Sequence, residues 1–248
     1  FTGHPEVDPE EENEELGLHG RLSFLPAKSV SAEGNWEGEE YVIRIRGKMR
    51  EAVPFGTNLE LTREISMVLG EKCFRIHDRI ENLDVNRSPL MFVYHCNPGF
   101  PILDEGTRLI INSAKTTEWT QDREVGPETY AKASAPVQEV QDNVYVHRVV
   151  ADVDGNGHVG LVNERLRLGL YWKFPQAEMP IANQWQHFHR GTYVTGIEPG
   201  NASMLGRAWN RENGVLQHIE PGEVREFHLE IGVLDGEDEI HGFESIVR

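Results

Sequence analysis

Residues 74–80 read Phe-Arg-Ile-His-Asp-Arg-Ile, in which apolar side chains alternate with mostly charged ones. A period of two is that of a β-strand with one face in the core and the other in water. The same alternation returns in residues 41–46, 59–66 and 224–231. We therefore predict an all-β protein built from long antiparallel strands.

Turn-forming residues separate these runs and predict tight turns, of the kind that hairpins use, at residues 33–35, 69–71, 154–157, 212–214 and 221–222. Residues 120–140 predict a loop with one short helix. Long helical periodicity is nearly absent elsewhere, and there is no internal repeat. The pattern favours one large sandwich or barrel domain over residues 16–248.

The composition excludes several classes of partner. The 248 residues include 24 Lys and Arg against 41 Asp and Glu, a net charge of −17, so we expect no nucleic acid and no membrane as partner. Two cysteines, Cys73 and Cys96, form no disulfide framework and indicate a reducing, cytoplasmic location. The chain opens at Phe1 with an acidic segment, residues 1–15, that we expect to be flexible; this start is typical of the interior of a longer protein.

Three segments place polar side chains beside Gly and Pro. Residues 16–27 contain His19 and Arg21. Residues 92–101 read as an apolar strand that delivers His95 and Asn97 where Pro and Gly stop it. Residues 193–201 end an apolar strand in Glu198, and aromatic clusters at 171–174 and 185–189 precede it. Polar groups at strand ends are typical of a site built from loops.

Each residue also has a purely structural interpretation. His95 could be a core histidine bonded to a carbonyl, Glu198 could bind turn amides, and Trp172 and Trp185 could belong to the core. Together, however, they offer an acid, a base and aromatic faces. A sugar needs this combination, because its CH faces stack on rings while its hydroxyls take directed hydrogen bonds.

The sequence resembles the galactose mutarotase-like superfamily of aldose 1-epimerases. It is most similar to a bacterial aldose 1-epimerase-like branch of carbohydrate-processing proteins labelled a domain of unknown function. The similarity runs over almost the whole chain and includes residues 19–21, 94–97, 103–106 and 196–199. It implies an antiparallel β-supersandwich with a sugar cleft on one concave side, lacking the strands that precede the His-Gly-Arg segment in other members.

The resemblance also implies roles for single residues. His95 corresponds to the acid that protonates the ring oxygen, Glu198 to the base that takes the anomeric proton, and His19 to the histidine that binds the sugar. Arg21 and Asp104 are candidates for the arginine and aspartate that hold the sugar. We further expect substrate contacts from Asn97, Trp172, Trp185 and His187.

The reaction predicted first is therefore the interconversion of sugar anomers by His/Glu acid–base catalysis, which requires no metal or redox cofactor. A sugar isomerase or lyase could use the same cleft, with a metal held by His19, His95 and His187 or His189. A non-catalytic carbohydrate-binding protein is the third alternative. In each case the partner is a small-molecule sugar, and the long alternating strands would permit a homodimer.

Overall fold

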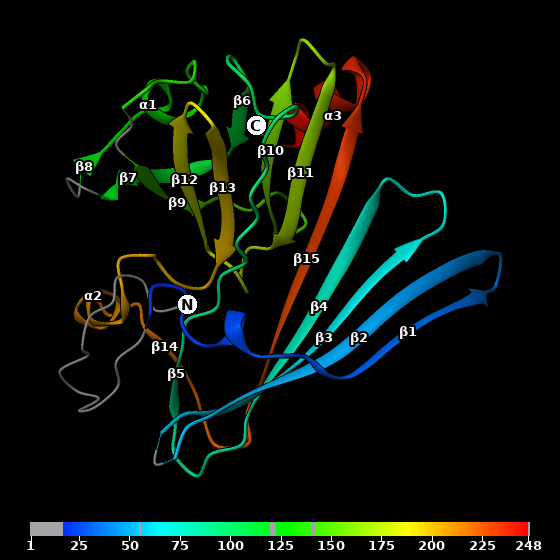
Figure 1. Ribbon diagram of the computed structural model, residues 1–248, viewed down its shortest axis with the longest axis vertical. Helices are drawn as coiled ribbons and strands as arrows, with labels where there is room; N and C mark the ends of the chain where they lie inside the picture. The colour runs from blue at the N-terminus through cyan, green and yellow to red at the C-terminus, as the bar shows by residue number, and fades with distance from the viewer. Residues whose placement is uncertain (1–16, 55, 120–122, 140–141, 248) are drawn as a thin grey trace. The chain divides into compact units, whose positions relative to one another are not determined.

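The computed structural model describes residues 17–54, 56–119, 123–139 and 142–247 (Figure 1). The acidic segment at residues 1–15 lies outside this part of the chain. Contacts divide the chain into two compact units, and each unit consists of two segments. The first unit comprises residues 1–92 and 201–229, and the second comprises residues 93–200 and 230–248. The expected single domain over residues 16–248 stays a prediction.

The first unit is built on four long strands that follow one another in the chain, seen in blue to cyan in Figure 1. Its elements are η1 (Leu22–Phe24), β1 (Lys28–Glu37), β2 (Glu40–Ala52), β3 (Asn58–Val68), β4 (Cys73–Asn82), β5 (Ser88–Leu90), α2 (Arg207–Glu212), β14 (Gln217–Ile219) and the first half of β15 (Val224–Asp235). The sheet order is β1-β2-β3-β4-β15, while β5 pairs with β14.

The four alternating runs of the sequence all form strands, as predicted. They correspond to β2, β3, β4 and β15. In β4, Ile76 and Ile80 are buried and His77 between them is exposed, which is the alternation that one wet face requires. The core of this unit includes Phe92 and Phe227, whose rings lie 4.8 Å apart.

The second unit contains two sheets. Its elements are β6 (Arg108–Ile111), β7 (Ser113–Glu118), β8 (Arg123–Glu124), α1 (Pro127–Tyr130), β9 (Asn143–Val149), β10 (Asn156–Asn163), β11 (Leu168–Pro175), β12 (Ile181–His189), β13 (Thr192–Gly200), the second half of β15 and α3 (Glu237–Val247). One sheet has the order β15-β11-β10-β6 and the other β13-β12-β9-β7-β8.

Side chains of both sheets meet in the core of the second unit. Leu109 of β6 and Leu161 of β10 line the same small void as Gln184 and Phe188 of β12. The two antiparallel sheets therefore pack face to face, which is the predicted sandwich. The short helix expected within residues 120–140 is α1.

Three features of the fold differ from the sequence-based expectations. Residues 33–35 form no turn but lie inside β1, and the chain reverses at Gly38, whose φ is +65°. Residues 91–99 form only isolated bridges rather than a regular strand. The third is the helix α3, which sequence analysis missed although Ile240, Phe243 and Val247 recur at helical spacing and are buried.

The helices of the described residues are short. The longest of them, α3, has 11 residues, and none is long and apolar enough to cross a membrane.

Candidate functional site

The strand β13 and the extended segment 93–99 build the site, and both belong to the second unit. The segment runs antiparallel along β13 through bridges from Val93 to Gly200, Cys96 to Ile197 and Gly99 to Val194. Two backbone hydrogen bonds fix the middle bridge, with N···O distances of 3.2 and 2.8 Å between Cys96 and Ile197. This pairing places the neighbours of Cys96 and Ile197 beside one another.

His95 and Glu198 are brought together by this pairing. The Nε2 atom of His95 lies 3.1 Å from Oε1 of Glu198. The side chain of His95 is 28% exposed, whereas that of Glu198 is 0% exposed. The sequence-based expectation that these two residues share one site is consistent with this geometry.

The buried carboxyl group of Glu198 has a raised pKa and lacks hydrogen bonds within the part of the chain that the structure describes. Neither of its oxygens has a hydrogen-bond partner of acceptable geometry among the described residues, despite the short distance to His95. Burial raises the pKa of Glu198 to about 8, because the ionised form loses its hydration. The alternative in which Glu198 binds turn amides therefore does not describe this residue. A strongly shifted carboxyl group beside a histidine is typical of a functional site.

Gly196 makes room for this carboxylate. Residues 196 and 198 point to the same face of β13, and a Cβ atom built on Gly196 would overlap Oε1 of Glu198. The glycine of the Gly-Ile-Glu-Pro sequence is therefore a steric requirement of the buried carboxylate. In the sequence this glycine stands out only as part of the Gly-Ile-Glu-Pro motif.

An aromatic row on β12 adjoins the pair. Trp185 faces Gly196 in the β12–β13 register, and its ring centroid lies 6.4 Å from that of His95. The rings of His187 and His189 continue the row at centroid separations of 5.6 and 6.0 Å. Nδ1 of His187 lies 2.5 Å from a carboxylate oxygen of Asp142, a partner that sequence analysis missed because it is 45 residues away.

Trp172 is not part of this row. Its side chain is 1% exposed in the core of the second unit, so the expectation of an accessible indole at this position is wrong. The structural interpretation of Trp172 as a core residue is the right one. Its position in β11, opposite Val159 and Ile231, explains the burial.

The other candidate residues of the second unit occupy different surroundings. Asn97 is exposed and lies two residues beyond His95. Asp104 receives the guanidinium of Arg165 and the backbone N–H of Glu105, and these contacts lower the pKa of Asp104, with the backbone hydrogen bond as the larger cause. A sugar would have to compete with Arg165 for this carboxylate.

His19 and Arg21 belong to the first unit. His19 is exposed, and Nη1 of Arg21 lies 3.1 Å from Oε1 of Glu51. Arg21 and Glu51 line a cavity of about 70 Å³ together with Arg207. Ligand sites for small molecules are typically about 300 Å³ or larger, so this cavity is smaller than a typical site of that kind. Convergence of His19 with His95 and Glu198 stays a prediction.

Comparison with known proteins places this geometry in a family context. A family model described as "Domain of unknown function (DUF4432)" matches residues 1–233. No curated protein matches the chain. A candidate aldose 1-epimerase from Klebsiella pneumoniae subsp. pneumoniae is 25% identical with a TM-score of 0.90, and the match covers 99% of this chain and 64% of that one. The chain thus spans less than two thirds of the length of that protein.

Two further structures have the same fold. The Slr1438 protein from Synechocystis sp. PCC 6803 is 17% identical with a TM-score of 0.65, over 88% of this chain and 69% of that chain. A galactose mutarotase-like protein from Clostridium acetobutylicum is 13% identical with a TM-score of 0.57, over 83% and 66%. The predicted galactose mutarotase-like fold is confirmed.

Proposed function

Because the chain belongs to the DUF4432 family and has a galactose mutarotase-like fold, we propose that it is an isomerase of the aldose 1-epimerase type acting on a small sugar. The observation that supports this proposal most is the buried Glu198 carboxyl group beside His95. The raised pKa of Glu198 makes the carboxylate a stronger base when it is ionised.

The proposed reaction interconverts the two anomers of an aldose. His95 donates a proton to the ring oxygen while Glu198 accepts the proton of the anomeric hydroxyl. The bond between the anomeric carbon and the ring oxygen breaks, and its electron pair stays on that oxygen. The open-chain aldehyde then rotates, and the two residues exchange roles as the ring closes on the other face. Protons and electrons balance without a co-reactant.

The geometry sets a condition on substrate binding. Glu198 has no accessible surface, so the sugar can reach it only when the side chains above it move. His95 lies beside it, and Trp185, whose ring centroid is 6.4 Å from that of His95, offers a ring face for stacking. We therefore propose that the sugar displaces His95 from Glu198 and settles between the two.

The test is saturation-transfer NMR between the α and β anomeric protons of a panel of aldoses. The variant Glu198→Gln keeps the side-chain shape but cannot accept a proton. We expect it to lower the exchange rate by about 10²–10⁴-fold while sugar binding persists. His95→Asn should have a similar effect. Glu128→Gln in the exposed helix α1 is the matched control and should retain full activity.

Two results would contradict the proposal. Unchanged exchange in Glu198→Gln would remove this residue from the mechanism. Sugar binding without exchange on any aldose in the wild-type protein would favour carbohydrate binding without catalysis, or isomerisation or elimination in the same site.

A further inference from the structure

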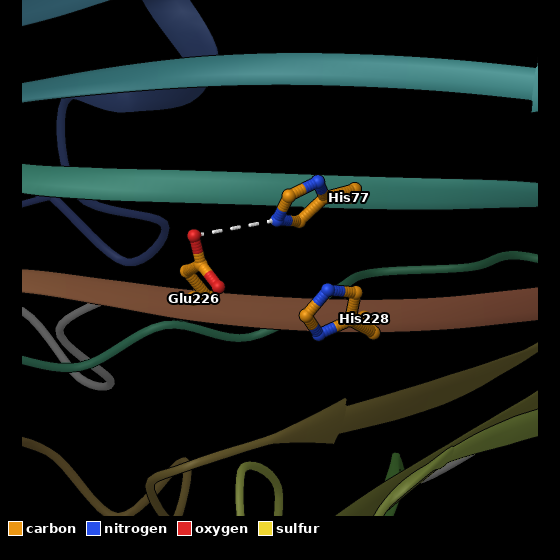
Figure 2. Close-up of side chains that lie close together, drawn as sticks. All are labelled: His77, Glu226 and His228. Atoms are coloured by element: carbon orange, nitrogen blue, oxygen red, sulfur yellow. Dashed lines mark ion pairs between the residues drawn. The ribbon is translucent and has the colours of Figure 1, made fainter.

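Two histidines and a glutamate that the proposed mechanism does not use gather on the exposed face of the first unit. They are His77 of β4 and Glu226 and His228 of the neighbouring strand β15 (Figure 2). Their possible ligand atoms all lie within 4.8 Å of one another. Nε2 of His77 lies 3.8 Å from Oε1 of Glu226, and the two imidazole rings stack at a centroid distance of 4.3 Å.

The strand alternation explains why these three side chains meet. Ile76, Phe227 and Leu229 point into the core, so their sequence neighbours His77, Glu226 and His228 point to the wet face. Adjacent strands are about 4.8 Å apart, which brings side chains of the same face into contact. The stacked rings in Figure 2 are the result.

We propose that His77, Glu226 and His228 bind a divalent transition-metal ion. Imidazole nitrogens and a carboxylate oxygen are ligands that Zn²⁺ takes readily, and two histidines with one glutamate leave a fourth position open for water. The three ligands come from two rigid neighbouring strands rather than from a loop. Such a site would differ from a metal held by His19, His95 and His187 or His189, the arrangement considered from the sequence.

The charges around His77 do not oppose a cation. Arg75 and Arg79 flank His77 on the same face of β4, but each has a carboxylate of its own. Nη1 of Arg75 lies 2.7 Å from Glu71, and Nη1 of Arg79 lies 2.8 Å from Glu81. The net charge of −17 adds a general attraction for cations.

Metal binding requires the rings to turn. Zinc–ligand bonds of about 2.0–2.2 Å bring the ligand atoms closer together than 4.8 Å, and stacked rings cannot both aim their lone pairs at one ion. Both histidines are exposed, so they can change rotamer without disturbing the core. The bound ion would then link β4 to β15 and stabilise the folded chain in proportion to its concentration.

Isothermal titration of the metal-free protein with Zn²⁺ tests the proposal. We expect one zinc ion per chain at this site. Residues that only hydrogen-bond to metal ligands typically contribute about 10–100-fold to metal affinity. Loss of a direct ligand should cost at least as much, so His77→Gln and His228→Gln should each weaken zinc binding at least about tenfold. His241→Gln in the exposed part of α3 is the matched control and should bind zinc like the wild-type protein.

A melting curve gives an independent reading. Zinc should raise the melting temperature of the wild-type protein and of His241→Gln, but not that of His77→Gln or His228→Gln. Circular dichroism without zinc should show the same fold in all four proteins, because the substituted side chains are exposed. Absence of zinc binding to the wild-type protein, or wild-type zinc affinity in His77→Gln and His228→Gln, would overturn the proposal.

Discussion

His95 and Glu198 lie 3.1 Å apart, yet only His95 reaches the solvent. The buried partner is the one whose pKa is shifted, to about 8, and it lacks a hydrogen bond of good geometry among the described residues. Catalytic hydrogen bonds are often poorly aligned before substrate binds, so this geometry suits a free enzyme. The arrangement also has a cost in stability that can be measured separately from activity.

The pH dependence of turnover should report on Glu198. In the free enzyme Glu198 is protonated below about pH 8 and must ionise to act as the base. Because His95 must keep its proton while Glu198 loses one, we expect kcat/KM for anomer exchange to follow a bell-shaped pH profile in which one of the two apparent pKa values is that of Glu198, about 8. The measurement is the exchange rate over pH 5–9 with the uncatalysed rate subtracted at each pH. A profile with no apparent pKa near 8 would contradict the role of Glu198 as base.

Glu198→Gln should make the protein more stable at high pH. In the unfolded chain Glu198 ionises above about pH 4.5, whereas in the folded protein it keeps its proton up to about pH 8. Folding therefore takes up a proton between these values, and the wild-type protein loses stability as the pH rises through this window.

Glutamine does not titrate, so the difference between variant and wild type should grow from pH 4.5 to about 8 and then level off. We expect the final difference in the free energy of unfolding to be on the order of a few kcal/mol. Urea unfolding at a series of pH values measures it. Curves that run parallel for the two proteins would show that Glu198 is not perturbed by burial.

Gly196→Ala should lower activity by displacing the Glu198 carboxylate without removing it. The added methyl group would overlap Oε1 of Glu198 and push the carboxylate away from its place beside His95. A displacement of about 1 Å can lower catalysis by about 10²-fold, which is the expected loss in exchange rate. Gly242→Ala in α3, where a Cβ atom meets nothing within 4 Å, is the control. Full activity in Gly196→Ala would contradict the steric role of this glycine.

The strands could be predicted because their alternation is local. The buried Ile76 and Ile80 and the exposed His77 follow from the period of two alone. The prediction of a turn at residues 33–35 was wrong because Gly34 lies in a strand, where the absence of a side chain leaves room for Tyr41. A Cβ atom on Gly34 would overlap the side chain of Tyr41. Local turn chemistry cannot distinguish these two uses of a glycine.

The site could be predicted only in part. Glu198 and His95 were found as polar residues beside Pro and Gly, but burial, which raises the pKa of Glu198, depends on packing between distant segments. The prediction that Trp172 contacts the substrate was wrong for the same reason. Whether an aromatic side chain faces a cleft or the core depends on how the neighbouring sheet packs, and Trp172 is buried. His77 and His228 stack on each other although they are 151 positions apart in the sequence, and no local sequence pattern predicts this contact.

Asp78 is a charged residue at a buried position of the strand pattern. It lies on the buried face of β4 with 0% of its side chain exposed, in line with Ile76 and Ile80. Arg63, its cross-strand partner on β3, donates two hydrogen bonds to it at 2.8 and 2.6 Å. The pairing is bidentate, which is the geometry that best compensates a buried carboxylate.

Arg63→Ala should therefore destabilise the protein strongly. It leaves Asp78 buried without its guanidinium partner, a loss that typically amounts to about 3–5 kcal/mol in the free energy of unfolding. Urea unfolding at neutral pH measures it. Arg46→Ala is the matched control from the same sheet, because Arg46 is 47% exposed and its ion pairs with Glu33 and Glu64 should contribute no more than about 1 kcal/mol. A loss in Arg63→Ala no larger than that in Arg46→Ala would mean that water reaches Asp78 and replaces the guanidinium.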